Sequence, residues 1–167
     1  AKKNIGTTND MAPLVIGVGP GFTSGETSTA DCHAVIETKR GHYLGRVIYD
    51  GSAIPNTGVP GNIGGFTKER VLRAPQDGIF EPVAKIGDLV SKGDIVATVS
   101  GIPVKATING VLRGLLQEGV PVFKGMKSGD IDPRCAPGHC FSASDKARAV
   151  GGGVLEALCH FTERLAG

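Results

Sequence analysis

The amino-acid sequence predicts a mainly β protein with some α structure: an α/β or β N-terminal region, a duplicated closed β-sandwich and a C-terminal helix. Its 26 glycines, 10 prolines and 5% aromatic residues favour short strands and tight turns. Residues 74–132 repeat one pattern at an offset of 32 residues, as from Gly78 to Gly110. The last part of the chain has the apolar spacing of a helix. These observations predict the domains 1–72, 73–132 and 133–167.

Charge and hydropathy exclude several classes of function. Lys and Arg number 18 against 16 Asp and Glu, and the charges are scattered, so we expect no nucleic-acid partner. The longest apolar runs, such as residues 14–18, are too short to cross a membrane. No secretion signal is recognisable, and the four cysteines lack a regular framework. We therefore expect a cytoplasmic protein with no membrane partner.

Region 1–72 contains three apolar, β-branched runs that predict strands, at residues 14–18, 33–38 and 44–49. The first run ends in the glycine-rich turn GPGF, and the other two are joined by KRGHY. Residues 51–66 are too rich in glycine and proline for regular structure. We predict a long loop there that is either ordered or functional.

The repeat in residues 73–132 is a match of individual positions. Asp77-Gly78 corresponds to Asn109-Gly110, and both pairs favour a turn. Two equal halves can bury together an interior that neither half buries alone. We predict a two-fold relation between the halves, with Gly78 and Gly110 in equivalent turns. Six apolar side chains are predicted to point inward: Ile79, Val83, Val90, Val111, Leu115 and Val122.

The sequences of the two halves resemble those of the biotinyl and lipoyl carrier domains: APQDGIFEPVAKIGDLVSKGDIVATV and ATINGVLRGLLQEGVPVFKGMKSGDI. The resemblance implies a barrel-sandwich hybrid fold. Those carriers hold a lysine flanked by methionines on a hairpin between the halves, whereas this connection reads SGIPVKAT. Its lysine, Lys105, stands where a strand begins. We therefore interpret Lys105 as a solvated strand residue and not as an attachment site.

Residues 133–167 are predicted to form a Cys-containing strand and a closing helix packed on the first region. An apolar stripe with spacings of three and four defines the helix: Val150, Val154, Leu158, Phe161 and Leu165. Ser144 is the predicted N-cap. Three consecutive glycines, residues 151–153, weaken a helix, so we expect close backbone packing or a kink there in preference to ligand binding.

The turn after the first predicted strand is a candidate cofactor-binding segment. Gly19, Gly21 and Phe22 stand where backbone N–H groups can approach an anion. Neither the dinucleotide fingerprint nor the P-loop pattern is met, so a purely structural turn is the alternative.

Four further residues are candidates for cofactor binding. Asn62, Gly64 and Gly65 belong to the GNIGG segment of the long loop, where glycines permit close approach of a ligand. His42 lies in the turn KRGHY with arginines nearby, a setting for anion binding or proton transfer. A solvent-exposed turn histidine is the alternative interpretation.

Cys140 is the candidate catalytic residue. It adjoins a glycine-rich turn and precedes Lys146 and Arg148, whose positive charges stabilise a thiolate when they lie close in space. Cysteine and histidine cluster near the C-terminus, but their spacing matches no standard zinc site, and we expect no metal. Cys32 and Cys159 are interpreted as small hydrophobic residues.

Segments across nearly the whole chain resemble the selenium-dependent molybdenum hydroxylase system proteins, a family of bacterial accessory proteins. They are KKNIGTTNDMAPLVIGVGPGF, HAVIETKRGHYLGRVIYDGSAIPNTGVPGNIGG, VLRAPQDGIF, GDIDPR and CFSASDKARAVGGGVLEA. The resemblance implies that these segments form the C-terminal part of a longer protein, preceded by a nucleotide-binding-like half. It further implies a partner, a molybdenum hydroxylase or its cofactor-maturation machinery, but no settled reaction.

Two hypotheses follow. In the first, the chain is a maturation factor that binds a cofactor of unknown identity or a chalcogen species, with GPGF, GNIGG and Cys140 at one site. In the second, it is a structural or assembly module that docks a partner enzyme or forms a homo-oligomer through the glycine-bearing helix. Convergence of these segments in space discriminates between the two.

Overall fold

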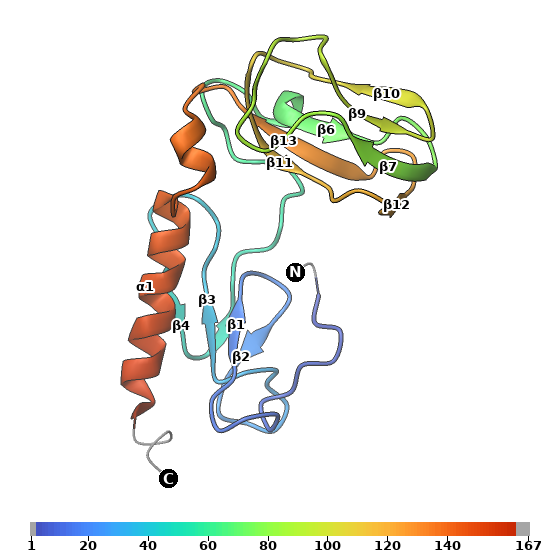
Figure 1. Ribbon diagram of the computed structural model, residues 1–167. Helices are drawn as coiled ribbons and strands as arrows, with labels where there is room; N and C mark the ends of the chain where they lie inside the picture. The colour runs from blue at the N-terminus through green and yellow to red at the C-terminus, as the bar shows by residue number, and fades with distance from the viewer. Residues whose placement is uncertain (1–2, 163–167) are drawn as a thin grey trace. The chain divides into compact units, whose positions relative to one another are not determined.

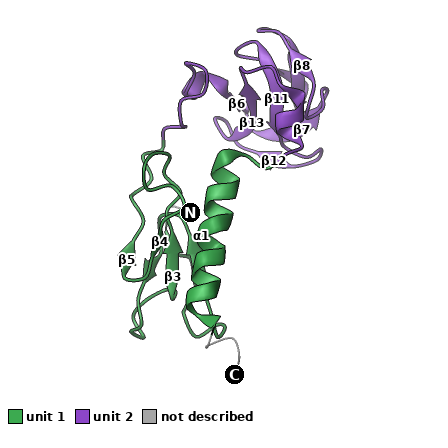
Figure 2. Cartoon of the chain, turned by 90° about the vertical axis from the view of Figure 1, so that its left-hand side faces the viewer, with its two compact units in different colours: residues 1–58, 143–167 green, residues 59–142 purple. Residues whose placement is uncertain are grey.

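The computed structural model describes residues 3–162, and its contacts divide the chain into two compact units (Figure 2). Unit 1 comprises residues 1–58 and 143–167, and unit 2 comprises residues 59–142. The predicted boundaries at 72 and 132 differ from this division. Residues 59–72 contain a strand that pairs within the second unit, and residues 133–142 cover one of its sheets. As predicted, the fold is mainly β with a C-terminal helix.

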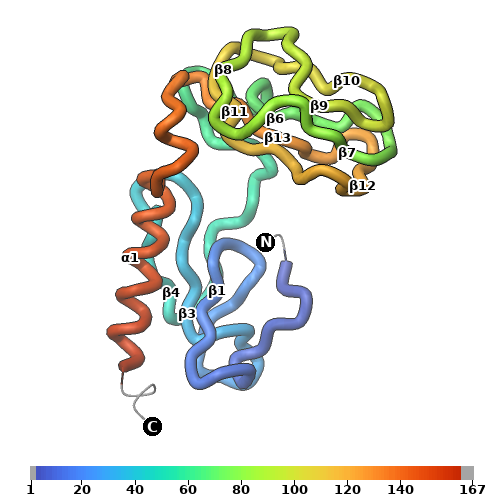
Figure 3. The backbone as a smooth tube through the Cα atoms, in the orientation of Figure 1, coloured from blue at the N-terminus to red at the C-terminus, as the bar shows by residue number. Residues whose placement is uncertain are grey.

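Unit 1 is built on a three-stranded sheet with the order β1-β3-β4 (Figures 1 and 3). β1 (Ile16–Val18) and β3 (Ala34–Ile36) are parallel, and β4 (Val47–Ile48) is antiparallel to β3. Each lies within one of the three predicted strands. The helix α1 (Asp145–His160) contacts all three strands and closes a core around Ile36. Unit 1 also holds a two-stranded antiparallel sheet of β2 (Thr23–Ser24) and β5 (Gly51–Ser52).

Helix α1 begins as predicted. The hydroxyl of Ser144 accepts a hydrogen bond from the backbone N–H of Ala147 at 3.1 Å, which confirms the N-cap. The stripe residues that pack on the core of unit 1 are Val150, Val154 and Phe161. Leu158 is 39% exposed, so its assignment to the stripe is wrong, because the buried face centres on Gly153 and Ala157. Leu165 lies outside the described residues.

The triple glycine permits close backbone packing at one of its three positions. A Cβ at Gly153 would clash with the carbonyl oxygen of Gly45, so only glycine allows the helix and this loop to approach so closely. Gly151 and Gly152 face open space. The prediction of close packing is therefore confirmed for Gly153 alone.

Unit 2 consists of two four-stranded sheets, with the orders β10-β9-β7-β12 and β6-β13-β11-β8. Its strands are β6 (Val71–Arg73), β7 (Gly78–Pro82), β8 (Leu89–Val90), β9 (Ile95–Val99), β10 (Ile102–Lys105), β11 (Gly110–Leu115), β12 (Pro121–Val122) and β13 (Lys127–Asp132). Two 3₁₀ helices flank them, η1 (Lys68–Arg70) and η2 (Pro137–Cys140). The strand predicted after residue 133 is absent from the described chain, because η2 occupies that segment.

The strands of unit 2 repeat at the offset seen in the sequence. Adding 32 to the residue numbers of β6, β7, β8 and β9 gives positions within β10, β11, β12 and β13, respectively. When each strand is replaced by its equivalent, the order of one sheet becomes the order of the other. Hydrogen bonds repeat in the same way. The N–H of Gly87 donates to the carbonyl of Leu112 at 2.8 Å, and the N–H of Gly119 donates to that of Phe80 at 2.9 Å. The two halves therefore exchange equivalent hydrogen bonds.

Gly78 and Gly110 occupy equivalent positions, but their backbone angles differ. Each begins a strand, and each lies against the equivalent neighbour, Ser100 for Gly78 and Asp132 for Gly110. Gly78 has φ +152°, whereas Gly110 is not among the glycines with positive φ. The two glycines therefore occupy equivalent positions, as predicted, but the prediction that their backbone conformations are equivalent is wrong.

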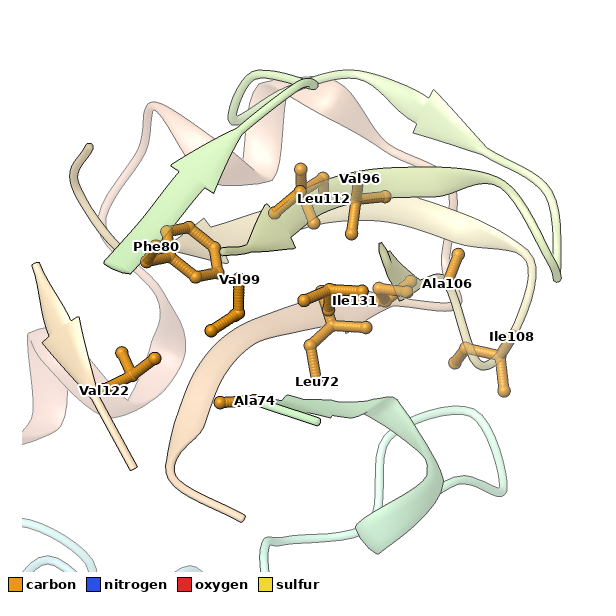
Figure 4. Packing of buried hydrophobic residues seen from close by; sticks show 12 residues of the cluster. Leu72, Ala74, Phe80, Val96, Val99, Ala106, Ile108, Leu112, Val122 and Ile131 are labelled. Carbon is orange, nitrogen blue, oxygen red and sulfur yellow. The ribbon is translucent and has the colours of Figure 1, made fainter. Parts of the chain in front are cut away.

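The core of unit 2 lies between the two sheets, where Phe80 and Val99 face Leu72 and Ile131 (Figure 4). Of the six residues predicted to point inward, Val122 is buried in the core, and Val90 and Leu115 are partly buried against it; Val111 is buried outside this core, on the outer face of β11, so the prediction of its direction is wrong. The prediction is wrong for Ile79 and Val83, which are 44% and 64% exposed. Side chains alternate along a strand, so the inward direction of Phe80 turns Ile79 outward.

No helix among the described residues is long and apolar enough to span a membrane.

Candidate ligand pocket

The glycine turn after β1 lies at the carboxyl end of two parallel strands. Gly19 and Gly21 have φ of +86° and +101°, a backbone region that favours glycine. The N–H of Gly19 donates to the carbonyl of Ile36 at 2.9 Å, which ties the turn to the end of β3. In open sheets with parallel strands, ligands bind outside this edge.

A pocket of about 520 Å³ opens beside this turn. Its lining residues come from the turn, from the end of β5 and from the loop that follows β5: Pro20, Gly21, Ser52, Ala53, Pro55, Asn56, Thr57 and Gly58. Within the described chain, the backbone N–H groups of Gly21 and Asn56 have no hydrogen-bond partner. The side-chain oxygen of Asn56 accepts from the N–H of Gly58 at 2.9 Å, which leaves the amide NH₂ as a donor. The pocket thus offers neutral donors and no charged side chain.

A buried carboxylate holds the outer loop of the pocket in place. Glu37 is 2% exposed and follows β3 directly. Its two oxygens accept backbone hydrogen bonds from Lys39 at 2.7 Å and from Ile54 at 2.8 Å. Ile54 stands between two pocket-lining residues, so Glu37 couples the end of β3 to the pocket wall. Our sequence reasoning missed this residue; the signal was a carboxylate at the end of the apolar run HAVI.

A second pocket in unit 1, of about 410 Å³, was also missed from the sequence. Its lining is Thr23, Ser24, Gly25, Glu26, Thr27, Thr29, Ala30, Tyr49 and Asp50. The hydroxyl of Ser24 is already engaged, because it donates to the carbonyls of Ile48 and Gly51 at 2.8 and 3.0 Å. Burial and the neighbouring Glu156 raise the pKa of Tyr49. Nothing in this second pocket involves a residue predicted to bind a cofactor.

Phe22 and His42, both predicted to bind a cofactor, do not line the first pocket. The ring of Phe22 packs over Gly17 and joins a small core cluster with Cys32. His42 is exposed in its turn, with its ring 5.1 Å from that of Tyr43. Of the predicted residues in unit 1, the structure therefore brings only Gly21 to the pocket, with Gly19 supporting the turn.

The GNIGG segment belongs to unit 2 and forms a turn of its own. The side-chain oxygen of Asn62 accepts from the N–H of Gly65 at 3.0 Å, and Ile63 pairs with Phe66. Gly64 has φ +58° and packs against Pro133. The geometry accounts for Asn62, Gly64 and Gly65 as turn residues, and they share no compact unit with Gly21.

Cys140 ends η2 in unit 2 and is half-buried, with its Sγ 3.7 Å from the carbonyl oxygen of Leu112. The basic residues Lys146 and Arg148 belong to unit 1. Cys135 and Cys159 are exposed, whereas Cys32 is fully buried and its pKa is raised by that burial. GPGF and Cys140 therefore do not meet within one compact unit.

The outer face of β13 carries a network of ion pairs centred on Asp132. The buried carboxylate of Asp132 accepts from the guanidinium of Arg134 at 2.6 Å and from that of Arg113 at 2.9 Å. Arg134 above all holds the pKa of Asp132 well below its usual range. Among the described residues, no group of three or more His, Cys, Asp or Glu is placed to hold a metal ion.

Comparison with known proteins gives one strong match. The chain is 58% identical over 158 residues to "Uncharacterized protein YqeB" of Escherichia coli K12, which covers 95% of this chain and 28% of that protein. The chain thus spans about 28% of the length of the curated relative it matches. An aspartoacylase family protein of Mesorhizobium loti shares 22% identity over 38% of this chain and 23% of its own, with a TM-score of 0.35, too low to carry an argument. No protein-family model matches.

Proposed function

We propose that this chain is part of an accessory or maturation factor for a selenium-dependent molybdenum hydroxylase, and that unit 1 binds a small oxyanion or a cofactor carrying one. The ligand-binding part of the proposal depends on one observation: the unpartnered N–H groups of Gly21 and Asn56 line one pocket. The link to a molybdenum hydroxylase depends on the resemblance of the sequence segments.

The donor set defines the chemical class of the ligand. Backbone N–H groups and amides bind anions through partial charges, as in other glycine-rich turns. The lining holds no Lys or Arg, so a multiply charged phosphate chain lacks compensation there. A compact oxyanion of low charge, such as hydrogen selenite, matches the donors. Cys140 remains a proposed chalcogen-handling thiol, separate from this pocket.

An NMR titration tests the proposal directly. We expect selenite, which is mainly singly charged hydrogen selenite at neutral pH, to shift the amide signals of Gly21 and Asn56 at constant ionic strength, with the unit 2 turn glycines Gly93 and Gly119 as unaffected references. Asn56→Ala should weaken binding several-fold. Asn62→Ala is the matched control, because it removes the same kind of side-chain cap from a turn in unit 2. Absence of any shift at millimolar anion, or equal losses in both variants, would exclude the pocket.

For unit 2 we infer a barrel-sandwich hybrid that is not a carrier. The reciprocal hydrogen bonds and equivalent strand orders support the fold. The hairpin turn between β9 and β10 consists of Ser100 and Gly101, with φ of 45° and 82°, and it holds no lysine. Lys105 lies at the other end of β10. Biotin or lipoyl attachment, detected as added mass after expression with the matching ligase, would contradict this inference.

Assembly is the second candidate function, and the exposed side of α1 favours it. Leu155 is 61% exposed, and Gly151 and Gly152 have open space above them. Small residues beside an exposed leucine allow the close approach of another helix. Sedimentation of the wild type and of Leu155→Lys tests self-association: a monomeric wild type excludes the homo-oligomer.

A further inference from the structure

Both chain connections between the units are attached to the same strand of unit 2. The chain enters unit 2 at residue 59 and leaves it at residue 142. On the entering segment, residues 59–70, the guanidinium of Arg70 pairs with the carboxylate of Asp130 at 2.8 Å. On the leaving segment, residues 133–142, the guanidinium of Arg134 pairs with the carboxylate of Asp132 at 2.6 Å. Asp130 and Asp132 are two residues apart on β13, so they point to the same side of the sheet.

The two segments also contact each other. Gly64 of the entering segment lies against the ring of Pro133, which directly follows Asp132. A Cβ at Gly64 would come within 3.1 Å of that ring. Pro133 therefore links Asp132 to the entering segment.

Unsatisfied polar atoms gather on this face. Among the described residues, four buried side-chain atoms lack a hydrogen-bond partner: Arg70 Nε, Ser128 Oγ, Asp130 Oδ1 and His139 Nδ1. All four belong to β13 or to the segments that cover it. Buried polar atoms normally have hydrogen-bond partners, so these four atoms mark a polar layer, unlike the apolar interior on the other side of β13.

The first half of the repeat shows that the fold does not require this polar row. Asp130 and Asp132 correspond at the 32-residue offset to Thr98 and Ser100, whereas Val96, the equivalent of Ser128, belongs to the apolar core. At these positions the Thr98 hydroxyl donates to the exposed Glu81 carboxylate at 2.8 Å, and the Ser100 hydroxyl accepts from the N–H of Ile79 at 3.2 Å, but neither residue takes part in an ion pair. The charged row is thus specific to β13, the strand with which both segments form ion pairs.

We propose that the outer face of β13 is an electrostatic anchor, which holds both connecting segments on unit 2 and releases them together. A buried carboxylate that loses its cation, or a buried cation that loses its carboxylate, is strongly unfavourable, so each segment stays closed while its pair is intact. Because both connections pass over this face, the anchor controls how freely they move. The proposal is independent of the ligand pocket in unit 1.

Hydrogen exchange of the whole chain, read by mass spectrometry, tests the anchor. Protected amides report on each segment: Ile63 and Phe66 on the entering one, and His139 on the leaving one. In Asp132→Asn we expect exchange to rise by roughly tenfold or more in both segments, since local opening sets the rate. Asp130→Asn should produce the same joint release. Thr98→Val is the matched control and should change neither segment.

Three results would overturn the anchor. The first is faster exchange confined to residues 133–142 in Asp132→Asn, since this would mean that the segments open independently. The second is unchanged exchange in both segments. The third is an equal effect of Thr98→Val. If Asp132→Asn does not fold, Arg134→Lys keeps the charge and loses the two-pronged geometry, and joint release at a smaller amplitude is then the expected result.

Discussion

The two halves of unit 2 share their strands and their inner faces but differ on their outer faces. Phe80 and Leu112 are equivalent and both fully buried. Their neighbours Ile79 and Val111 are also equivalent, yet Ile79 is 44% exposed and Val111 is fully buried. The 3₁₀ helix η2 packs on β11, and β7 has no such cover among the described residues. Duplication therefore conserves the core pattern, and the segment that follows the repeat decides which outer face is buried.

The largest expected effect tests the shared inner faces. Phe80→Ala and Leu112→Ala each remove a fully buried side chain from the same core, so each should lower the free energy of unfolding by about 3–5 kcal/mol. Urea unfolding followed by circular dichroism measures the loss. A cost below about 1 kcal/mol for either variant would show that one half contributes little to the common core.

The next effect concerns the buried carboxylate, which is confined to the second half. Arg134 lowers the pKa of Asp132 in the folded state, so ionised Asp132 stabilises the fold. This contribution is complete above the ordinary aspartate pKa of about 3.9 and is lost as the pH falls below it. Asp132→Asn should therefore cost about 2–4 kcal/mol at pH 7 and less at pH 3.

Unfolding at both pH values, with an exposed carboxylate as control, checks this sign. Asp94→Asn removes a carboxylate that only caps a turn, so its cost should stay below about 1 kcal/mol at pH 7. A cost of Asp132→Asn that grows on acidification would contradict the assigned direction.

A smaller effect separates the covered outer face from the open one. Val111→Ala removes two buried methyl groups and should cost about 2 kcal/mol. Ile79→Ala, at the equivalent position, should cost clearly less because its side chain already contacts water. Equal costs in denaturant unfolding would mean that η2 does not shield β11 in solution.

The smallest effect concerns thiol reactivity, measured as labelling rates near neutral pH in single Cys→Ser variants. If exposure alone sets the labelling rate, Cys135 and Cys159 react fastest, half-buried Cys140 reacts more slowly, and Cys32 reacts slowest. The chalcogen-handling hypothesis predicts that Cys140 reacts faster than Cys32 and Cys159, which requires activation beyond exposure. If Cys140 labels only after denaturation, it is a core residue and that hypothesis fails.

The sequence by itself determined the features that depend on local chemistry and on self-similarity. The 32-residue offset predicted two equivalent halves, because equal patterns of turn and apolar residues favour equal strands. Ser144 and the apolar spacing after it predicted where α1 begins. The triple glycine predicted close packing or a kink, since a helix tolerates consecutive glycines only for a reason, and the structure assigns the close packing to Gly153.

Only the tertiary structure decided which faces are covered and which residues meet. The pocket joins Gly21 to Asn56 through strands that are distant in sequence, and Glu37 supports it with both carboxylate oxygens. Asp132 acquires its perturbed pKa from Arg113 and Arg134, and the burial of Val111 depends on a segment beyond the repeat. Alternation along a strand specifies two faces, but burial is a property of what packs on each face, and that contact forms only in the folded chain.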